Sequence, residues 1–146
     1  LGNPLDYETE MGPLTSALRR DRVLSYVDVA KEQGGEILTG GKPPAKPELA
    51  NGFYVEPTIV HAKPTDRVSQ EEVFGPFVTV TTFKTDEEAL TVANSTEYGL
   101  GSGLWTRDLA RAHRVASRLE AGMVSVNTSS APASSASSTS SRARPW

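Results

Sequence analysis

The sequence predicts an α/β fold in which a largely parallel sheet is flanked by helices. Two observations support this prediction: short apolar segments of strand character alternate with segments of helical periodicity, and turn residues separate them at the spacing of α/β folds. The chain has 146 residues, the size of one domain. Because parallel sheets are normally buried on both faces, such a fold needs helix layers on both sides.

The first half of the chain begins with a long predicted helix. Thr15 or Ser16 can cap a helix that runs to about Gln33, and the glycines at 34 and 35 end it. Apolar residues recur on one face of this helix at i, i+3, i+4 and i+7, namely Val23, Tyr26, Val27 and Ala30. This spacing predicts the face that packs on the sheet.

Strands and an exposed loop are expected next. The segment 36–39 has strand character, and the segment 42–52 carries three prolines and indicates a loop. The segment 53–61 is a further strand candidate that Pro57 interrupts. A proline inside a strand indicates an edge or a bulge at that point.

The second half predicts a regular alternation of elements. In order, they are a helical turn over 66–72, a strand over 77–83, a helix opened by the capping box 85–88, a strand over 101–106, a helix capped by Asp108 and ended by Gly122, and a strand over 123–126.

Charge and composition exclude several classes of function. Lys and Arg number 15 against 18 Asp and Glu, a net charge of −3, so a nucleic-acid partner is not expected. No apolar run approaches the roughly 20 residues that cross a bilayer, and the N-terminus has neither a signal nor a transit pattern, which favours a cytoplasmic protein without a membrane partner. With no cysteine and only two histidines, His61 and His113, a metal site or a cysteine nucleophile is not expected in this chain.

The last 19 residues differ in composition from the rest of the chain. Of residues 128–146, 8 are Ser, whereas the preceding 127 residues contain 7 Ser. We therefore expect a globular segment over 1–127 and a Ser-rich disordered tail over 128–146. Because the sequence does not begin with Met, we also expect it to be cut from something longer.

Two segments invite a functional interpretation. Gly99, Gly101 and Gly103 lead into a strand rather than open a helix, so they favour close backbone packing over a phosphate-binding loop. The segment 71–76, Glu-Glu-Val-Phe-Gly-Pro, holds two carboxylates and an aromatic ring just before a strand. Such a carboxylate can accept hydrogen bonds from a ribose diol, and the ring can pack on a flat heterocycle, although a Glu pair before a turn is more often solvated surface.

The segment 71–76 resembles the motif "E-E-[hydrophobic]-F-G-P" of the aldehyde dehydrogenase superfamily. The resemblance extends from Gly2 to about Asn127, nearly the whole globular segment, and implies that residues 1–127 are a partial catalytic domain of the family. Further matching segments occur in the family's order: Gly2–Asp6, Met11–Leu14, Gly52–Thr58, Tyr98–Leu100, Trp105–Asp108 and Glu120–Asn127.

The resemblance implies roles for two residues of the motif. In the family, the second glutamate binds the hydroxyls of the nicotinamide ribose and the phenylalanine lies against the nicotinamide, which correspond to Glu72 and Phe74 here. Arg22 lies at a helix position that can approach the cofactor. The implied parent is a homo-oligomeric enzyme that uses NAD or NADP to oxidise an aldehyde or semialdehyde to a carboxylic acid.

Other parts of the family's active site are missing from this chain. By resemblance, the catalytic cysteine, the glutamate base, the asparagine of the oxyanion site and the dinucleotide-binding domain would precede Leu1. We therefore expect an inactive fragment of an NAD(P)-dependent aldehyde dehydrogenase. Two alternatives stay open: a non-catalytic remnant or interaction module on the same scaffold, and a relative that reduces acyl phosphates.

Overall fold

The computed structural model describes residues 1–128, and the predicted Ser-rich tail lies outside the described residues apart from Thr128. The chain divides by its internal contacts into two compact units, Leu1–Thr82 and Phe83–Trp146. The division falls inside the segment that the sequence predicts as one partial domain. Each unit is described separately.

The first unit is organised around the helix α1 (Ala17–Glu32). Ser16, one of the two predicted caps, precedes it in an extended conformation, and its Oγ accepts a hydrogen bond from the Arg19 N–H at 3.3 Å. The helix ends at Glu32, and Gly34, two residues later, has a φ of 81° in the left-handed region that glycine adopts without strain. The four residues of the predicted apolar face are all buried, which confirms that prediction.

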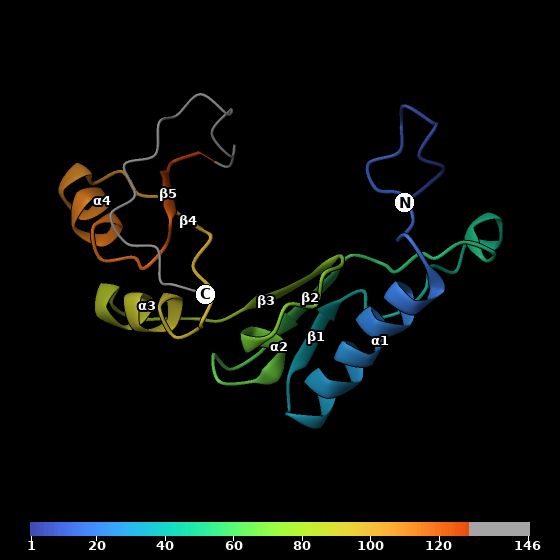
Figure 1. The fold of residues 1–146 in the computed structure, drawn as a ribbon, viewed down its shortest axis with the longest axis horizontal. Coiled ribbons are helices and arrows are strands. Elements are labelled where there is room, and N and C mark those ends of the chain that lie inside the picture. Colours follow the sequence, from blue (N-terminus) through green and yellow to red (C-terminus); the bar gives the residue numbers. More distant parts are fainter. Residues whose placement is uncertain (129–146) are drawn as a thin grey trace. The chain divides into compact units, whose positions relative to one another are not determined.

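A three-stranded mixed sheet lies beside α1, with strand order β1-β2-β3 (Figure 1). β1 (Glu36–Thr39) runs antiparallel to β2 (Thr58–His61), and β3 (Phe77–Val80) runs parallel to β2. The prediction of a strand over 53–61 is wrong in its first half, because pairing begins only after Pro57, which has no N–H to donate. β3 also ends at Val80, three residues before the predicted end.

The loop before β2 contains a short element that the sequence did not predict. Residues Pro47–Leu49 form the 3-10 helix η1, with a proline at its first position, where the missing N–H has no helical partner to lose. Leu49 is buried and anchors this loop to the unit.

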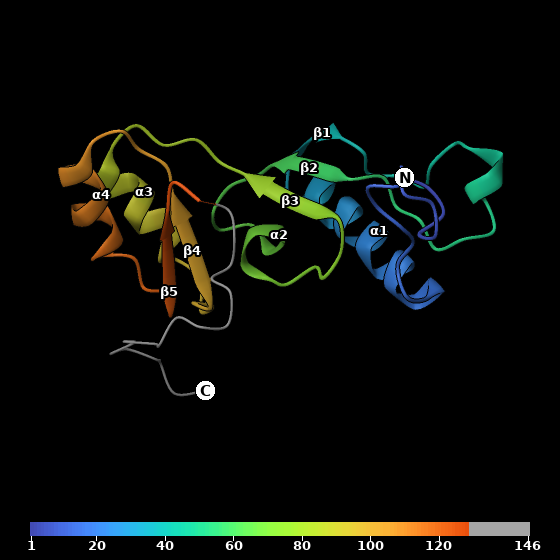
Figure 2. The ribbon, with the colours of Figure 1, turned by 90° about the horizontal axis from the view of Figure 1, so that it is seen from above.

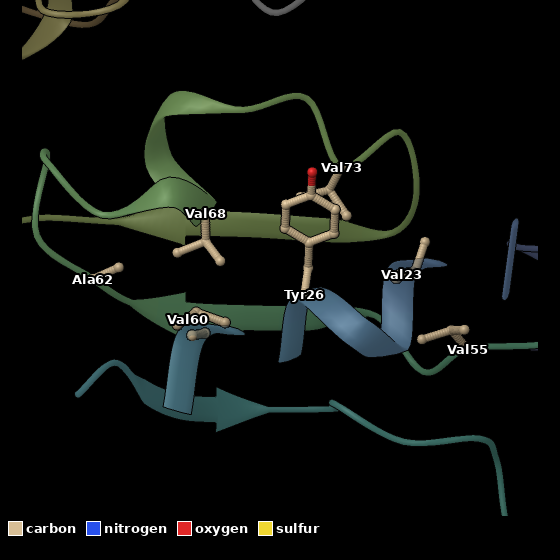
Figure 3. Packing of buried hydrophobic residues seen from close by; sticks show 8 residues of the cluster. Val23, Tyr26, Val55, Val60, Ala62, Val68 and Val73 are labelled. Carbon is tan, nitrogen blue, oxygen red and sulfur yellow. The ribbon is translucent and has the colours of Figure 1, made fainter. Parts of the chain in front are cut away.

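The core of the first unit covers one face of the sheet. The helix α2 (Arg67–Gln70) follows β2 and lies on the same face of the sheet as α1 (Figure 2). The buried side chains between these layers are shown in Figure 3: Val23, Tyr26, Ala30, Val55, Val60, Ala62, Val68 and Val73.

The other face of this sheet is not covered within the first unit, residues 1–82. Ile59 and Val78 are paired across β2 and β3 on that face, and they are 37% and 56% exposed. Within this unit, α1 and α2 supply one of the two helix layers that such a fold needs.

The second unit has two strands and two helices. α3 (Asp86–Ala93), β4 (Gly101–Leu104), α4 (Leu109–Ala116) and β5 (Met123–Val126) follow one another, and β4 pairs with β5 in parallel. The predicted caps are confirmed: Thr85 Oγ1 accepts from the Glu88 N–H at 3.1 Å, and Asp108 Oδ1 from the Arg111 N–H at 3.0 Å. β4 ends at Leu104, two residues earlier than predicted.

Ion pairs connect α3 to α4 and the turn after it, where the two helices lie side by side (Figures 1 and 2). Asp86 pairs with Arg111 and Arg114, and Glu87 pairs with Arg118. Close backbone packing is confirmed at Gly99, where a Cβ would come within 2.7 Å of the Glu120 carbonyl oxygen, but not at Gly101, where it would meet only Met123 Cε at 3.9 Å. No helix within residues 1–128 is long and apolar enough to cross a membrane.

Candidate functional site

The candidate site is the segment 71–76, which connects α2 to β3. Its last residue is fixed to the sheet, since the Thr58 N–H donates to the Pro76 carbonyl oxygen at 2.8 Å. Gly75 lies against α1, where a Cβ would come within 2.3 Å of Val23 Cγ2, so this contact leaves no room for a side chain. The Phe77 N–H closes the turn by donating to the Gly75 carbonyl oxygen at 2.7 Å.

The first carboxylate of the segment is fully engaged inside the unit. Tyr26 Oη donates to Glu71 Oε2 at 2.7 Å. Arg67 binds the same carboxylate with both sides of its guanidinium, Nε to Oε1 at 2.9 Å and Nη2 to Oε2 at 3.0 Å. The hydrogen bonds from Arg67 and then from Tyr26 lower the pKa of the Glu71 carboxyl to about 2. Glu71 is therefore an ionised structural group.

The next three residues alternate between the solvent and the core. Glu72 is exposed and its carboxylate has no hydrogen-bond or ion-pair partner within residues 1–128. Val73 is 7% exposed and joins the core cluster with Tyr26 (Figure 3). Phe74 is 68% exposed. A carboxylate and an aromatic ring thus face away from the core on either side of a buried anchor.

Phe74 has an unusual backbone and a defined neighbour. Its φ of 61° lies in the left-handed region, which is uncommon for a residue with a side chain and often marks a functional turn. The guanidinium carbon of Arg19, on the first turn of α1, lies 5.4 Å from the centroid of the Phe74 ring. This distance is that of a cation–π contact. The ring is consequently held from the side of α1 while most of its surface stays open.

Arg22 is directed at a protein group in this structure. Its Nη2 donates to Tyr26 Oη at 3.5 Å, and its guanidinium carbon lies 5.7 Å from the Tyr26 ring centroid. The expectation that Arg22 approaches a cofactor is not tested by these contacts. They connect Arg22 instead to the group of side chains around Glu71.

Three residues that fix the segment were not predicted to do so, namely Tyr26, Arg67 and Arg19. Tyr26 was predicted only as part of the apolar face of its helix. Arg67 and Glu71 are four residues apart, a spacing that favours an ion pair on a helix and could have been noticed. No sequence signal joins Tyr26 to Glu71, because 45 residues separate them. In the described residues, no group of His, Asp and Glu is arranged to hold a metal ion.

Comparison with known proteins supplies the family. The family model described as "Aldehyde dehydrogenase family" matches residues 1–139. The chain belongs to the aldehyde dehydrogenase family. The resemblance carried by the segment 71–76 and its neighbours is therefore confirmed, and the fold is that of part of an aldehyde dehydrogenase domain.

Known proteins of similar sequence and structure cover most of this chain. Acetaldehyde dehydrogenase of Pseudomonas aeruginosa is 49% identical over 127 residues, covering 86% of this chain and 25% of the relative. The crystal structure of PnpE from Pseudomonas sp. WBC-3 is 71% identical with a TM-score of 0.84, covering 86% of this chain and 26% of that one. PnpE has also been solved in complex with nicotinamide adenine dinucleotide.

A solved structure of lower sequence identity matches this chain with a similar TM-score and similar coverage. Betaine aldehyde dehydrogenase of Staphylococcus aureus in complex with NAD⁺ is 44% identical with a TM-score of 0.84, covering 86% of this chain and 25% of that one. The chain spans about a quarter of the length of the aldehyde dehydrogenases it matches. It therefore corresponds to one part of such an enzyme.

Proposed function

We propose that this chain supplies the nicotinamide side of the NAD site in an aldehyde dehydrogenase that oxidises an aldehyde or semialdehyde to a carboxylic acid. The observation that carries the proposal is the presentation of Glu72 and Phe74 beside a buried anchor, Val73. Membership of the family and the NAD complexes of PnpE and of the staphylococcal enzyme support it.

The two exposed residues fit the chemistry of the cofactor. A carboxylate that has no partner among the described residues, such as that of Glu72, can accept two hydrogen bonds from a vicinal diol, as the nicotinamide ribose offers. An exposed ring on a fixed backbone can pack against the flat nicotinamide. The bound cofactor would supply the acceptor for the hydride of the aldehyde carbon. Glu72 would set the depth of the ring by holding its ribose, and Phe74 would limit its rotation.

The nucleophile would come from outside this chain. The chain contains no cysteine, so the thiolate that the family uses to attack the aldehyde has no source among its 146 residues. We therefore expect the chain alone to form no NADH from NAD and any aldehyde. Through the family resemblance, we also propose that the parent is homo-oligomeric and takes NAD or NADP. A cytoplasmic location stays a prediction from the sequence.

A chimera tests the proposal. Residues 1–127 would replace the matching quarter of PnpE, the relative that is 71% identical. We expect the folded chimera to bind NAD and to form NADH from acetaldehyde, betaine aldehyde or a short semialdehyde, while the isolated chain forms none. A folded chimera that binds no NAD, or that only reduces acyl phosphates, would contradict the proposal. Turnover by the isolated chain that survives repurification would contradict the expected inactivity.

A further inference from the structure

We propose that Tyr26, Glu71 and Arg67 form a positioning network that fixes the backbone of 71–74, so that Glu72 and Phe74 are presented to the nicotinamide half of the cofactor. The inference rests on the proposed function of Glu72 and Phe74. It adds residues that act through this pair without touching the cofactor.

The network joins three separate elements at one carboxylate. Tyr26 lies in the second half of α1, Arg67 begins α2, and Glu71 is the first residue after α2. Both carboxylate oxygens of Glu71 are used, Oε1 by Arg67 and Oε2 by Arg67 and Tyr26. A bidentate guanidinium fixes the plane of the carboxylate, and the phenol fixes its position against α1. These contacts hold the Glu71 carboxylate against both α1 and α2.

Glu71 is joined directly to Glu72 by a peptide bond, so the position of one constrains the other. Glu71 has extended backbone angles, φ −110° and ψ 148°, so successive side chains leave the backbone on opposite sides. Glu71 is held by Tyr26 of α1 while 40% of its side chain stays exposed, and Val73 is inserted in the core. The hydrogen-bonded Glu71 and the buried Val73 thus hold the backbone on both sides of Glu72, whose side chain is exposed.

The same anchors act on Phe74. Val73 and the close approach of Gly75 to Val23 hold the residues on both sides of Phe74, whose φ of 61° would relax if either neighbour were released. Arg19 contacts the Phe74 ring from α1, the helix that also carries Tyr26. Displacement of Glu71 from Tyr26 would therefore allow the whole segment to shift relative to α1.

The experiment uses Tyr26→Phe in the chimera with PnpE, with Tyr54→Phe as its matched control. Tyr54 is a buried tyrosine of the same unit whose Oη donates one hydrogen bond, to the Gly2 carbonyl oxygen at 3.0 Å, and no residue of 71–76 takes part in that bond. Both substitutions delete one buried phenol hydroxyl. Melting temperature, kcat, KM for NAD and the primary isotope effect of a deuterated aldehyde are measured for each variant.

We expect Tyr26→Phe to lower kcat for hydride transfer about two- to tenfold and to raise the isotope effect, because one hydrogen bond to a charged group is lost. Tyr54→Phe lowers the melting temperature to a similar extent and leaves kcat unchanged. In the Glu72→Gln background, Tyr26→Phe should lower kcat less than about twofold, since it acts through the same interaction. Arg67→Met, which removes the bidentate contact to Glu71 at an exposed position, should reproduce the kinetic pattern.

The outcomes separate this inference from the proposed function. If Glu72→Gln impairs hydride transfer while Tyr26→Phe and Arg67→Met change kcat no more than Tyr54→Phe, the positioning network is refuted and the proposed function survives. If the two substitutions Tyr26→Phe and Glu72→Gln lower kcat in the double variant by the product of their separate effects, the positioning network is also refuted. If Glu72→Gln leaves kcat and KM for NAD unchanged, the proposed site itself is wrong.

Discussion

Glu72→Gln in the chimera is the most direct perturbation of the proposed site. The substitution keeps the shape of the side chain and removes its charge and one acceptor. Because the Glu72 carboxylate has no partner within residues 1–128 and is exposed, its loss should not change the free energy of unfolding. The effect on activity then reports the cofactor alone. Hydrogen bonds to charged groups contribute about 1.5–3 kcal/mol each, which corresponds to roughly ten- to hundredfold in rate.

Stopped-flow formation of NADH measures this loss. We expect the change mainly in kcat for hydride transfer, with a larger primary isotope effect on a deuterated aldehyde. The affinity for NAD should change less, because in the proposed site Glu72 would contact only one half of the dinucleotide. Glu48→Gln, at an exposed position of η1, is the matched control and should leave kcat unchanged. The reasoning is refuted if Glu71→Gln impairs hydride transfer and Glu72→Gln does not.

Three further predictions concern stability and assembly. Gly75→Ala should lower the melting temperature of the chimera, because its Cβ would lie 2.3 Å from Val23 Cγ2 and such overpacking costs about 1–3 kcal/mol of unfolding free energy. Gly101→Ala is the control, since its Cβ meets only Met123 Cε at 3.9 Å and the substitution should cost less. The pKa of Glu71 is lowered from 4.5 to about 2, so the stabilising effect of its carboxylate is present above pH 4.5 and is lost as the pH falls towards 2. In urea unfolding, the chimera and its Glu71→Gln variant should therefore differ less in free energy of unfolding at about pH 3 than at about pH 6. Equal differences at the two pH values would contradict this. The isolated chain should associate at micromolar concentration through the uncovered sheet face, where Val78 is 56% exposed, and a sharp monomeric sedimentation boundary would argue against it.

Local signals in the sequence predicted most helix starts, because a cap is decided within three or four residues. Ser16, Thr85 and Asp108 all accept the hydrogen bonds expected of their positions. Strand limits were less accurate, since a strand exists only where a partner pairs with it. The segment before Pro57 has strand composition and no ladder, and the expected strand from Phe77 stops at Val80, where its pairing with β2 ends.

In the candidate site too, the parts that local sequence signals identify were predicted and the parts that depend on distant contacts were not. Glu72 and Phe74 were predicted through the family motif, and the structure places both outward from a buried Val73. Their supports were not predictable, because contacts between distant parts of the chain depend on how α1 packs on the sheet. The hydrogen bond from Tyr26 to Glu71 spans 45 residues, and it exists only because α1 and α2 share one face of the sheet.

The left-handed backbone at Phe74 limits which residues can replace it, independently of what its ring contacts. At a φ of 61°, a side chain branched at Cβ collides with its own backbone, so isoleucine or valine would be disfavoured even where an apolar group of their size fits. Asparagine and glycine enter this region most easily. A redesign that aims to widen the nicotinamide side of the enzyme for a bulkier cofactor analogue should therefore begin with those two residues, and a saturation library at this position should be depleted of β-branched survivors.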